Sequence, residues 1–233
     1  MTARTQMLAG QTSNRKIDSM SETSIQAVLW DFGGVILSSP FEAFNRYEQA
    51  NELPTDFIRS VNTSNPDDNA WAKLERNDVA PAEFDALFAT ESEALGHRVP
   101  GRDVLSLLSG DVRTEMVAAL DRVIEAGYAT ACLTNNVVSD DTATQKRPDV
   151  AAVMAKFDHV VESSKVGIRK PERRFYEIAC DLVGTTPDQC VFLDDLGINL
   201  KPARAMGMTT IKVGAADQAI GDLEAILQIP LRQ

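Results

Sequence analysis

The sequence predicts an α/β fold, a doubly wound (Rossmann-like) parallel sheet with a block of helices inserted into it. Short apolar runs of strand length alternate with helical patterns from residue 110 to the end of the chain. A similar run, Ala27–Trp30, lies far upstream, before a stretch that contains only helical patterns. Strands separated by helices form βαβ units with parallel strands, and a helical block that interrupts them is typical of an insertion. We therefore expect a core from residues 25–40 and 110–233, with a helical insertion at 41–109.

The first strand is expected at Ala27–Trp30, where four apolar residues precede Asp31 and two glycines. In the insertion, Phe41, Phe44 and Tyr47 have helical spacing, and Pro81 suits a first helical turn. The expected helices of the insertion lie around residues 41–47 and at 51–60, 69–77 and 81–95.

The second part of the core alternates regularly. A helix at 114–126 carries its apolar residues on one face and ends at Gly127, and Gly184 ends a later helix. The expected strands lie at 128–133, 159–161, 191–193 and 209–213. The remaining expected helices lie around 150–154 and at 171–182, 200–206 and 223–227.

Residues 1–24 are polar and lack any hydrophobic period, so they are expected to form a flexible leader, with Met20 as an alternative initiator. No signal peptide or run of membrane-spanning length is visible. The three cysteines lack metal-ligand spacing and are expected to be free core thiols in a reducing cytoplasm. The formal net charge of −11 argues against nucleic acid or an anionic membrane as the main partner.

Polar groups follow several of the expected strands and point to an enzyme. Asp31 follows the first strand, and Asp194 and Asp195 follow another. Since the carboxyl ends of parallel strands meet at one edge of a sheet, these carboxylates are expected to share a crevice that suits a metal cation. Thr134 and Asn135 also follow a strand. Each group alone is more often a turn or a helix cap, but together they favour a functional site.

With Lys170, in the segment Gly167-Ile168-Arg169-Lys170-Pro171, the groups follow the order acid, hydroxyl, lysine, paired acids. This order resembles the four motifs of the haloacid dehalogenase superfamily over nearly the whole chain from residue 25. The segment 192–204 is similar to the N-terminal phosphatase domain of soluble epoxide hydrolases. The start Asp31-Phe32-Gly33-Gly34-Val35 is similar to related sugar-phosphate phosphatases. The insertion at 41–109 matches the helical cap of that family.

The resemblance implies a role for each motif residue in hydrolysis of a small phosphorylated metabolite. Asp31 would be the nucleophile, and Lys170 would stabilise charge on the phosphoryl group that Thr134 and Asn135 bind. Asp31, the carbonyl of Gly33 and Asp195 would bind Mg²⁺. Asp194 and Asn199 would support these ligands.

One position departs from the pattern. Phosphatases of the family carry a second aspartate two residues after the nucleophile, as general acid and base, but here that residue is Gly33. Such a group contributes about 10²–10⁴-fold to rate. Its absence indicates a substrate with a good leaving group, a proton from another source, or a catalytically weak domain that binds a phospho-ligand. A metal-independent haloacid dehalogenase is the other alternative. The physiological substrate and the oligomeric state are not predicted.

Overall fold

The computed structural model describes residues 24–136 and 147–232 and contains a five-stranded parallel sheet. The predicted leader therefore lies outside the described residues, apart from Ser24. The strand order is β3-β2-β1-β4-β5, so the sheet extends in both directions from β1, as a doubly wound fold requires. The strands are β1 (Ala27–Trp30), β2 (Ala129–Thr134), β3 (His159–Glu162), β4 (Cys190–Asp194) and β5 (Thr209–Lys212). The predicted fold class is confirmed.

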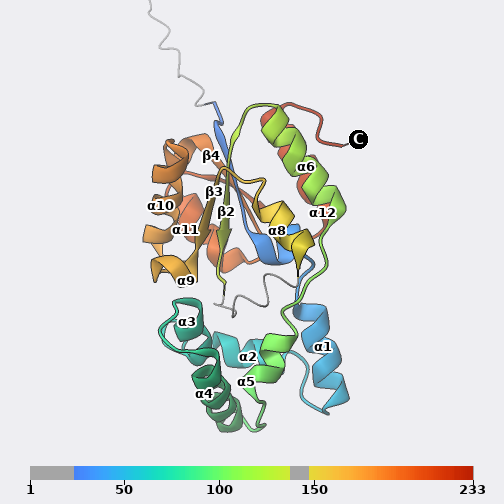
Figure 1. Ribbon diagram of the computed structural model, residues 1–233, viewed down its shortest axis with the longest axis vertical. Coiled ribbons are helices and arrows are strands. Elements are labelled where there is room, and N and C mark those ends of the chain that lie inside the picture. The colour runs from blue at the N-terminus through green and yellow to red at the C-terminus, as the bar shows by residue number, and fades with distance from the viewer. Residues whose placement is uncertain (1–23, 137–146, 233) are drawn as a thin grey trace, which may run out of the picture.

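Helices cover both faces of the sheet because successive strand residues point to opposite sides. Trp30 and Val28 face one side, while Leu29 and Ala27 face the other. The first side is covered by α6 (Thr114–Glu125), α8 (Pro148–Met154) and α12 (Ala216–Leu227). The second side is covered mainly by α10 (Arg173–Val183) and α11 (Gly197–Ala205) (Figure 1). Short helices α9 (Ser163–Val166) and η2 (Pro187–Gln189) complete this part.

The helices between β1 and α6 form a separate body beyond the carboxyl edge of the sheet (Figure 1). They are α1 (Phe41–Ala50), α2 (Phe57–Thr63), α3 (Ala70–Glu75), α4 (Pro81–Ala94) and α5 (Gly101–Ser106). Buried side chains from all five, including Phe44, Phe84 and Val104, form an apolar cluster of their own. We call these helices the cap. The boundaries 41–109 stay a prediction.

Two cap helices differ from expectation. The expected helix at 51–60 begins later, at Phe57, because the chain turns at Asp56, where φ is +61°. The Glu48 carboxylate accepts hydrogen bonds from the backbone N–H groups of Asp56 (2.8 Å) and Ile58 (2.9 Å), and so caps this helix from another element. Helix α5 was not expected from the sequence.

The cap connects to the core through two chain segments that pair with each other. Leu37 and Val112 form an antiparallel bridge, and the Ser38 N–H donates to the carbonyl of Asp111 (2.8 Å). The Arg113 N–H donates to the carbonyl of Ile36 (2.9 Å). Since Asp31 lies only a few residues before this pairing, the cap is attached next to the proposed nucleophile.

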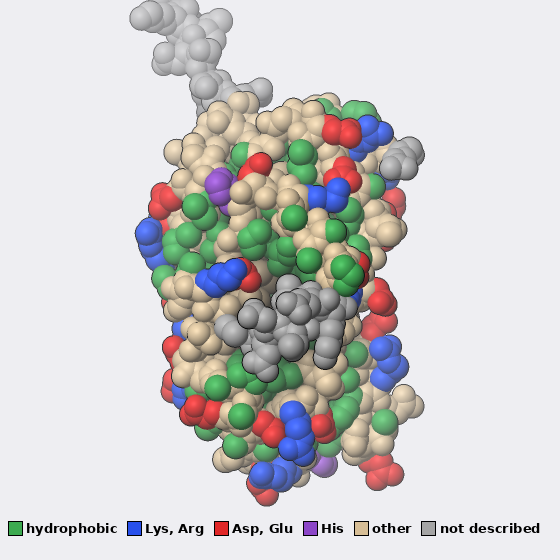
Figure 2. Space-filling view, viewed as in Figure 1, with side chains coloured by type: hydrophobic (Ala, Val, Ile, Leu, Met, Phe, Trp, Pro, Cys, Tyr) green, Lys and Arg blue, Asp and Glu red, His purple; other side chains and the backbone are tan. Residues whose placement is uncertain are grey.

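In the part of the chain that the structure describes, no helix is both long and apolar enough to cross a membrane. Cys132, Cys180 and Cys190 are buried free thiols, as expected. On the face shown in Figure 2, acidic and basic side chains are interspersed. A location in the cytoplasm stays a prediction.

Candidate active site

The turn after β1 places Asp31 at the carboxyl edge of the sheet. Asp31 is extended (φ −69°, ψ 159°), and its Oδ1 accepts a hydrogen bond from the N–H of Phe32 (2.7 Å), the first residue of the turn η1 (Phe32–Ile36). This bond orients the carboxylate and leaves Oδ2 without a hydrogen bond from another described residue. A buried carboxylate with one open oxygen can act as a nucleophile or as a metal ligand.

Lys170 lies between two carboxylates that come from neighbouring strands. Its Nζ is 2.7 Å from Oδ1 of Asp31 and 2.8 Å from Oδ2 of Asp194, and the lysine is only 1% exposed. Burial by itself would lower the pKa of Lys170, but Asp194 and Asp31 raise it above its ordinary value. The ammonium group is therefore retained throughout the neutral range.

Asp194 is held by hydrogen bonds on both of its oxygens. Oδ1 accepts from the N–H of Leu196 (2.8 Å) and from Nδ2 of Asn199 (3.0 Å), which also lies 3.1 Å from Oδ2. Because Oδ2 also binds Lys170, this carboxylate is fully occupied. The geometry thus brings together Asp194, Asn199 and Lys170. Support of the metal ligands by Asp194 and Asn199 stays a prediction.

Asp195 is the less constrained member of the pair, since the side chain of no other described residue donates a hydrogen bond to it. Its carboxylate lies against Gly34, where φ is +75° and an added Cβ would be 2.1 Å from Oδ2 of Asp195. Only glycine allows this approach at Gly34. Arg113 donates to the carbonyl of Gly34 (3.0 Å) and was not singled out by sequence reasoning.

The three carboxylates fit a cation site. Asp31, Asp194 and Asp195 each offer an oxygen, and these atoms all lie within 4.8 Å of one another. Burial, followed by the charge of Asp194, raises the pKa of Asp195 to about 6, and burial raises the pKa of Asp31 well above its ordinary value although Lys170 opposes this. The cluster thus holds three carboxyl groups and one ammonium group, that of Lys170. Oxygen donors of this kind suit a divalent cation such as Mg²⁺.

Thr134 and Asn135 lie at the end of β2, beside β1 in the sheet. The Thr134 side chain is buried and forms no hydrogen bond with another described residue. The Asn135 amide forms hydrogen bonds with both the backbone N–H and the backbone carbonyl of Lys170. Its Oδ1 accepts from the Lys170 N–H (2.8 Å), and its Nδ2 donates to the Lys170 carbonyl (3.0 Å). A hydrogen bond from Asn135 to a phosphoryl group stays a prediction, as does binding of a metal by the Gly33 carbonyl.

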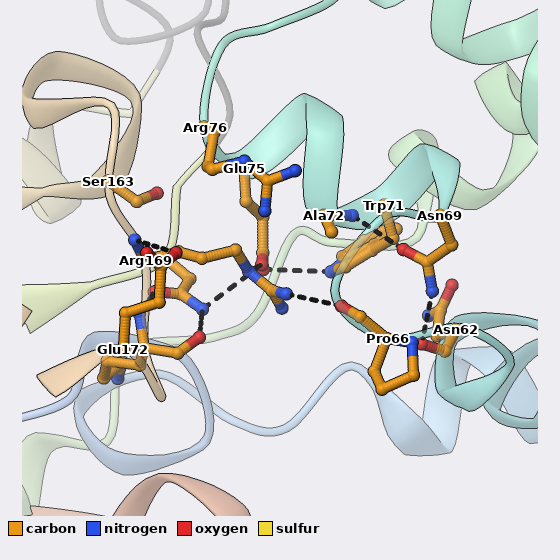
Figure 3. Close-up of polar contacts among 12 residues, drawn as sticks. Asn62, Pro66, Asn69, Trp71, Ala72, Glu75, Arg76, Ser163, Arg169 and Glu172 are labelled. Carbon is orange, nitrogen blue, oxygen red and sulfur yellow. Dashed lines mark hydrogen bonds and ion pairs between the residues drawn. The ribbon is translucent and has the colours of Figure 1, made fainter.

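Sequence reasoning missed a polar contact between the cap and the core. Glu75, at the end of α3, points toward Arg169 of the core in Figure 3, and the Arg169 Nε lies 2.5 Å from its Oε2. Arg169 also donates to the carbonyl of Pro66 in the cap (2.9 Å). Glu75 precedes Arg169 by 94 positions, so no local pattern links the two residues.

Comparison with known proteins supports this description. A family model described as haloacid dehalogenase-like hydrolase matches residues 25–207. The chain is 32% identical to mouse acyl-CoA dehydrogenase family member 10, over 89% of this chain and 20% of that protein. It is 30% identical to mouse bifunctional epoxide hydrolase 2, over 87% of this chain and 39% of that protein. The chain thus spans less than half the length of these curated relatives.

Solved structures show the same fold. A HAD family enzyme from Bacteroides thetaiotaomicron, in complex with magnesium and inorganic phosphate, superimposes with a TM-score of 0.56 and 21% identity, over 81% of this chain and 94% of that one. The family match covers most of the chain and includes every motif residue named above. The chain belongs to the haloacid dehalogenase-like hydrolases.

Proposed function

We propose that this hydrolase is a phosphatase that acts on a small phosphate monoester through an aspartyl-phosphate on Asp31. The observation that carries the proposal is the buried arrangement of Asp31, Lys170 and Asp194, with one oxygen of Asp31 left open. Lys170 holds the nucleophile in place and puts a positive charge where phosphoryl oxygens would gather. Thr134, at the same edge, would donate its hydroxyl to one of these oxygens.

In the first step, Oδ2 of Asp31 forms a bond to phosphorus while the bond from phosphorus to the ester oxygen breaks, and the departing oxygen takes a proton from water. In the second step, water attacks phosphorus and gives a proton to solvent, which replaces the proton taken in the first step; the bond to Asp31 breaks, and inorganic phosphate leaves. Since Gly33 offers no side chain for proton transfer, we expect preference for substrates with a good leaving group, such as anomeric sugar phosphates or acyl phosphates.

Asp31, Asp195 and the carbonyl of Gly33 would hold Mg²⁺, with Asp194 and Asn199 supporting them. The ion would neutralise charge on the phosphoryl oxygens. Asp195 suits this role better than Asp194, since both oxygens of Asp194 already accept hydrogen bonds from the protein.

The test is a screen of sugar, lipid, nucleotide and acyl phosphates with Mg²⁺ and with EDTA, using Asp31→Asn as the control. We expect turnover that EDTA abolishes and that the control lacks. Turnover by Asp31→Asn would show that another group is the nucleophile. Release of halide from 2-haloacids, undiminished by EDTA, would favour a dehalogenase. Saturable phosphate binding without turnover would indicate a binding domain.

A further inference from the structure

Glu75 is a buried carboxylate of the cap that faces the core and has no part in the reaction proposed above. The residue is 6% exposed, and both of its oxygens accept hydrogen bonds. Its Oε1 accepts from Nε1 of Trp71 (2.9 Å), within the cap. Its Oε2 accepts from Nε of Arg169 (2.5 Å), as Figure 3 shows. The same oxygen accepts from Nδ2 of Asn135 (3.2 Å), and both donors belong to the core.

The contact with Asn135 leads directly to the lysine of the active site. An asparagine amide has a donor end and an acceptor end, and a carboxylate can only accept. Glu75 therefore favours the Asn135 amide orientation in which Nδ2 points toward the cap. That orientation presents Oδ1 to the N–H of Lys170 and leaves Nδ2 to donate to the Lys170 carbonyl as well. The backbone N–H and carbonyl of Lys170 favour this same orientation, and the cap carboxylate reinforces it.

The position of Lys170 tolerates little change. Its Nζ lies within 2.8 Å of two carboxylates on different strands, and the side chain is enclosed. A backbone shift of Lys170 would lengthen at least one of these contacts. Displacing a catalytic group by about 1 Å costs on the order of 10²-fold in rate.

We propose that Glu75 is a positioning residue for Lys170: it joins the cap to Arg169 and orients the Asn135 amide that holds the lysine backbone. The proposal rests on the phosphatase function proposed above. It differs from a role in cap docking alone, for which Arg169 and Pro66 would suffice and Asn135 would be irrelevant.

Glu75→Ala tests the proposal, with Glu48→Ala as its matched control. Glu48 is also a buried cap carboxylate, but among the described residues its hydrogen-bond donors are backbone N–H groups of the cap. We expect Glu75→Ala to lower kcat about 10- to 100-fold with a much smaller change in KM. Glu75→Gln keeps an acceptor oxygen and should recover part of the loss. An equal fall in kcat for Glu48→Ala would overturn the proposal, since it would show a general effect of weakening the cap.

A double-mutant cycle separates positioning from docking. If Glu75 acts through Asn135, Glu75→Ala should lower kcat in the wild-type background but hardly at all in Asn135→Ala. If the two substitutions lower kcat independently, so that their fold-changes multiply in the double variant, the proposal is contradicted. Trp71→Phe removes the hydrogen bond that Glu75 accepts within the cap and leaves the contacts of Glu75 with the core, so it should change kcat far less than Glu75→Ala. A loss as large as that of Glu75→Ala would assign the effect to the cap interior.

Hydrogen exchange at the backbone N–H of Lys170, followed by NMR, provides a readout that does not need turnover. Exchange should be faster in Glu75→Ala than in Glu48→Ala, and unchanged exchange would refute the role of Glu75. If the wild type turns over no phosphate ester, the proposed function fails, while the exchange data still decide whether Glu75 holds Lys170. If the wild type is active and Glu75→Ala has the same kcat, the positioning role alone fails.

Discussion

Adjacent glycines in the turn after β1 are expected to respond in opposite ways to the same added methyl group. Gly34 has φ +75°, and a Cβ there would lie 2.1 Å from Oδ2 and 2.4 Å from Cγ of Asp195. Gly33 has φ −69° and ψ 132°, which any residue can adopt, and a Cβ there would meet nothing within 4 Å. Gly34→Ala and Gly33→Ala therefore form a matched pair.

The magnitudes follow from the two environments. The left-handed conformation costs an alanine about 1–2 kcal/mol, so Gly34→Ala should lower the free energy of unfolding by at least that amount. Gly33→Ala should raise it by about 0.4–1 kcal/mol, since alanine reduces the freedom of the unfolded chain. The collision at position 34 involves a side chain, which can rotate away. Asp195 would then leave the proposed Mg²⁺ site, and Mg²⁺ affinity should fall by at least about 10–100-fold.

Urea unfolding without metal and calorimetric titration with Mg²⁺ measure these two effects. Asp195→Ala is the reference for loss of the ligand, and Gly34→Ala should resemble it in Mg²⁺ affinity, whereas Gly33→Ala should resemble the wild type. The reasoning would be refuted if both glycine variants had the same stability, or if Gly34→Ala bound Mg²⁺ as tightly as Gly33→Ala.

Other predictions concern charge and proton transfer. Lys170→Met should lower the free energy of unfolding by about 3–5 kcal/mol at pH 7, since it leaves two buried carboxylates without their cation. The loss should be smaller at pH 4, where carboxylates bind protons. Equal losses at both pH values, measured by urea unfolding, would contradict this. Gly33→Asp should fold normally and change the ratio of rates between good and poor leaving groups, and identical kinetics across such a panel would argue against a missing acid. Burial raises the pKa of Glu75, although Arg169 opposes the shift. A carboxyl group whose pKa is raised by folding stabilises the folded state at low pH, and this contribution is lost as pH rises. The stability of the wild type relative to Glu75→Gln should therefore decline above about pH 4.3, the ordinary pKa of a glutamate. A relative stability that increases over this range would show the opposite shift.

The sequence predicted the sheet well because its signals are local. The central strands β1 and β4 are short, mainly apolar runs, and Gly127 and Gly184 follow the ends of their helices. The motif residues could be placed at one edge because parallel strands share a direction. Asp31 and Asp194 do meet there, through Lys170.

The cap was predicted less well because some of its structure depends on contacts between distant residues. The start of α2 is fixed by the side chain of Glu48, which lies in α1. The contact of Glu75 with Arg169 and Asn135 joins segments that no periodicity relates. The sequence showed which residues could carry the chemistry, but the residues that hold them in place became visible only in the packed structure.

The two glycines also clarify what the missing acid means. The backbone favours glycine at position 34, since φ is positive and an added Cβ would displace the Asp195 carboxylate. Gly33 is not required in this way, because its conformation is ordinary and the space beside it is open. The structure therefore gives no steric reason for the absence of an aspartate at this position. For the proposed phosphatase, two explanations then lie in the substrate, which either needs no proton from the protein or occupies the space that the side chain would fill. The comparison of Gly33→Asp with the wild type on small and bulky esters separates these two explanations, because only a substrate that fills the space would be excluded by the new side chain.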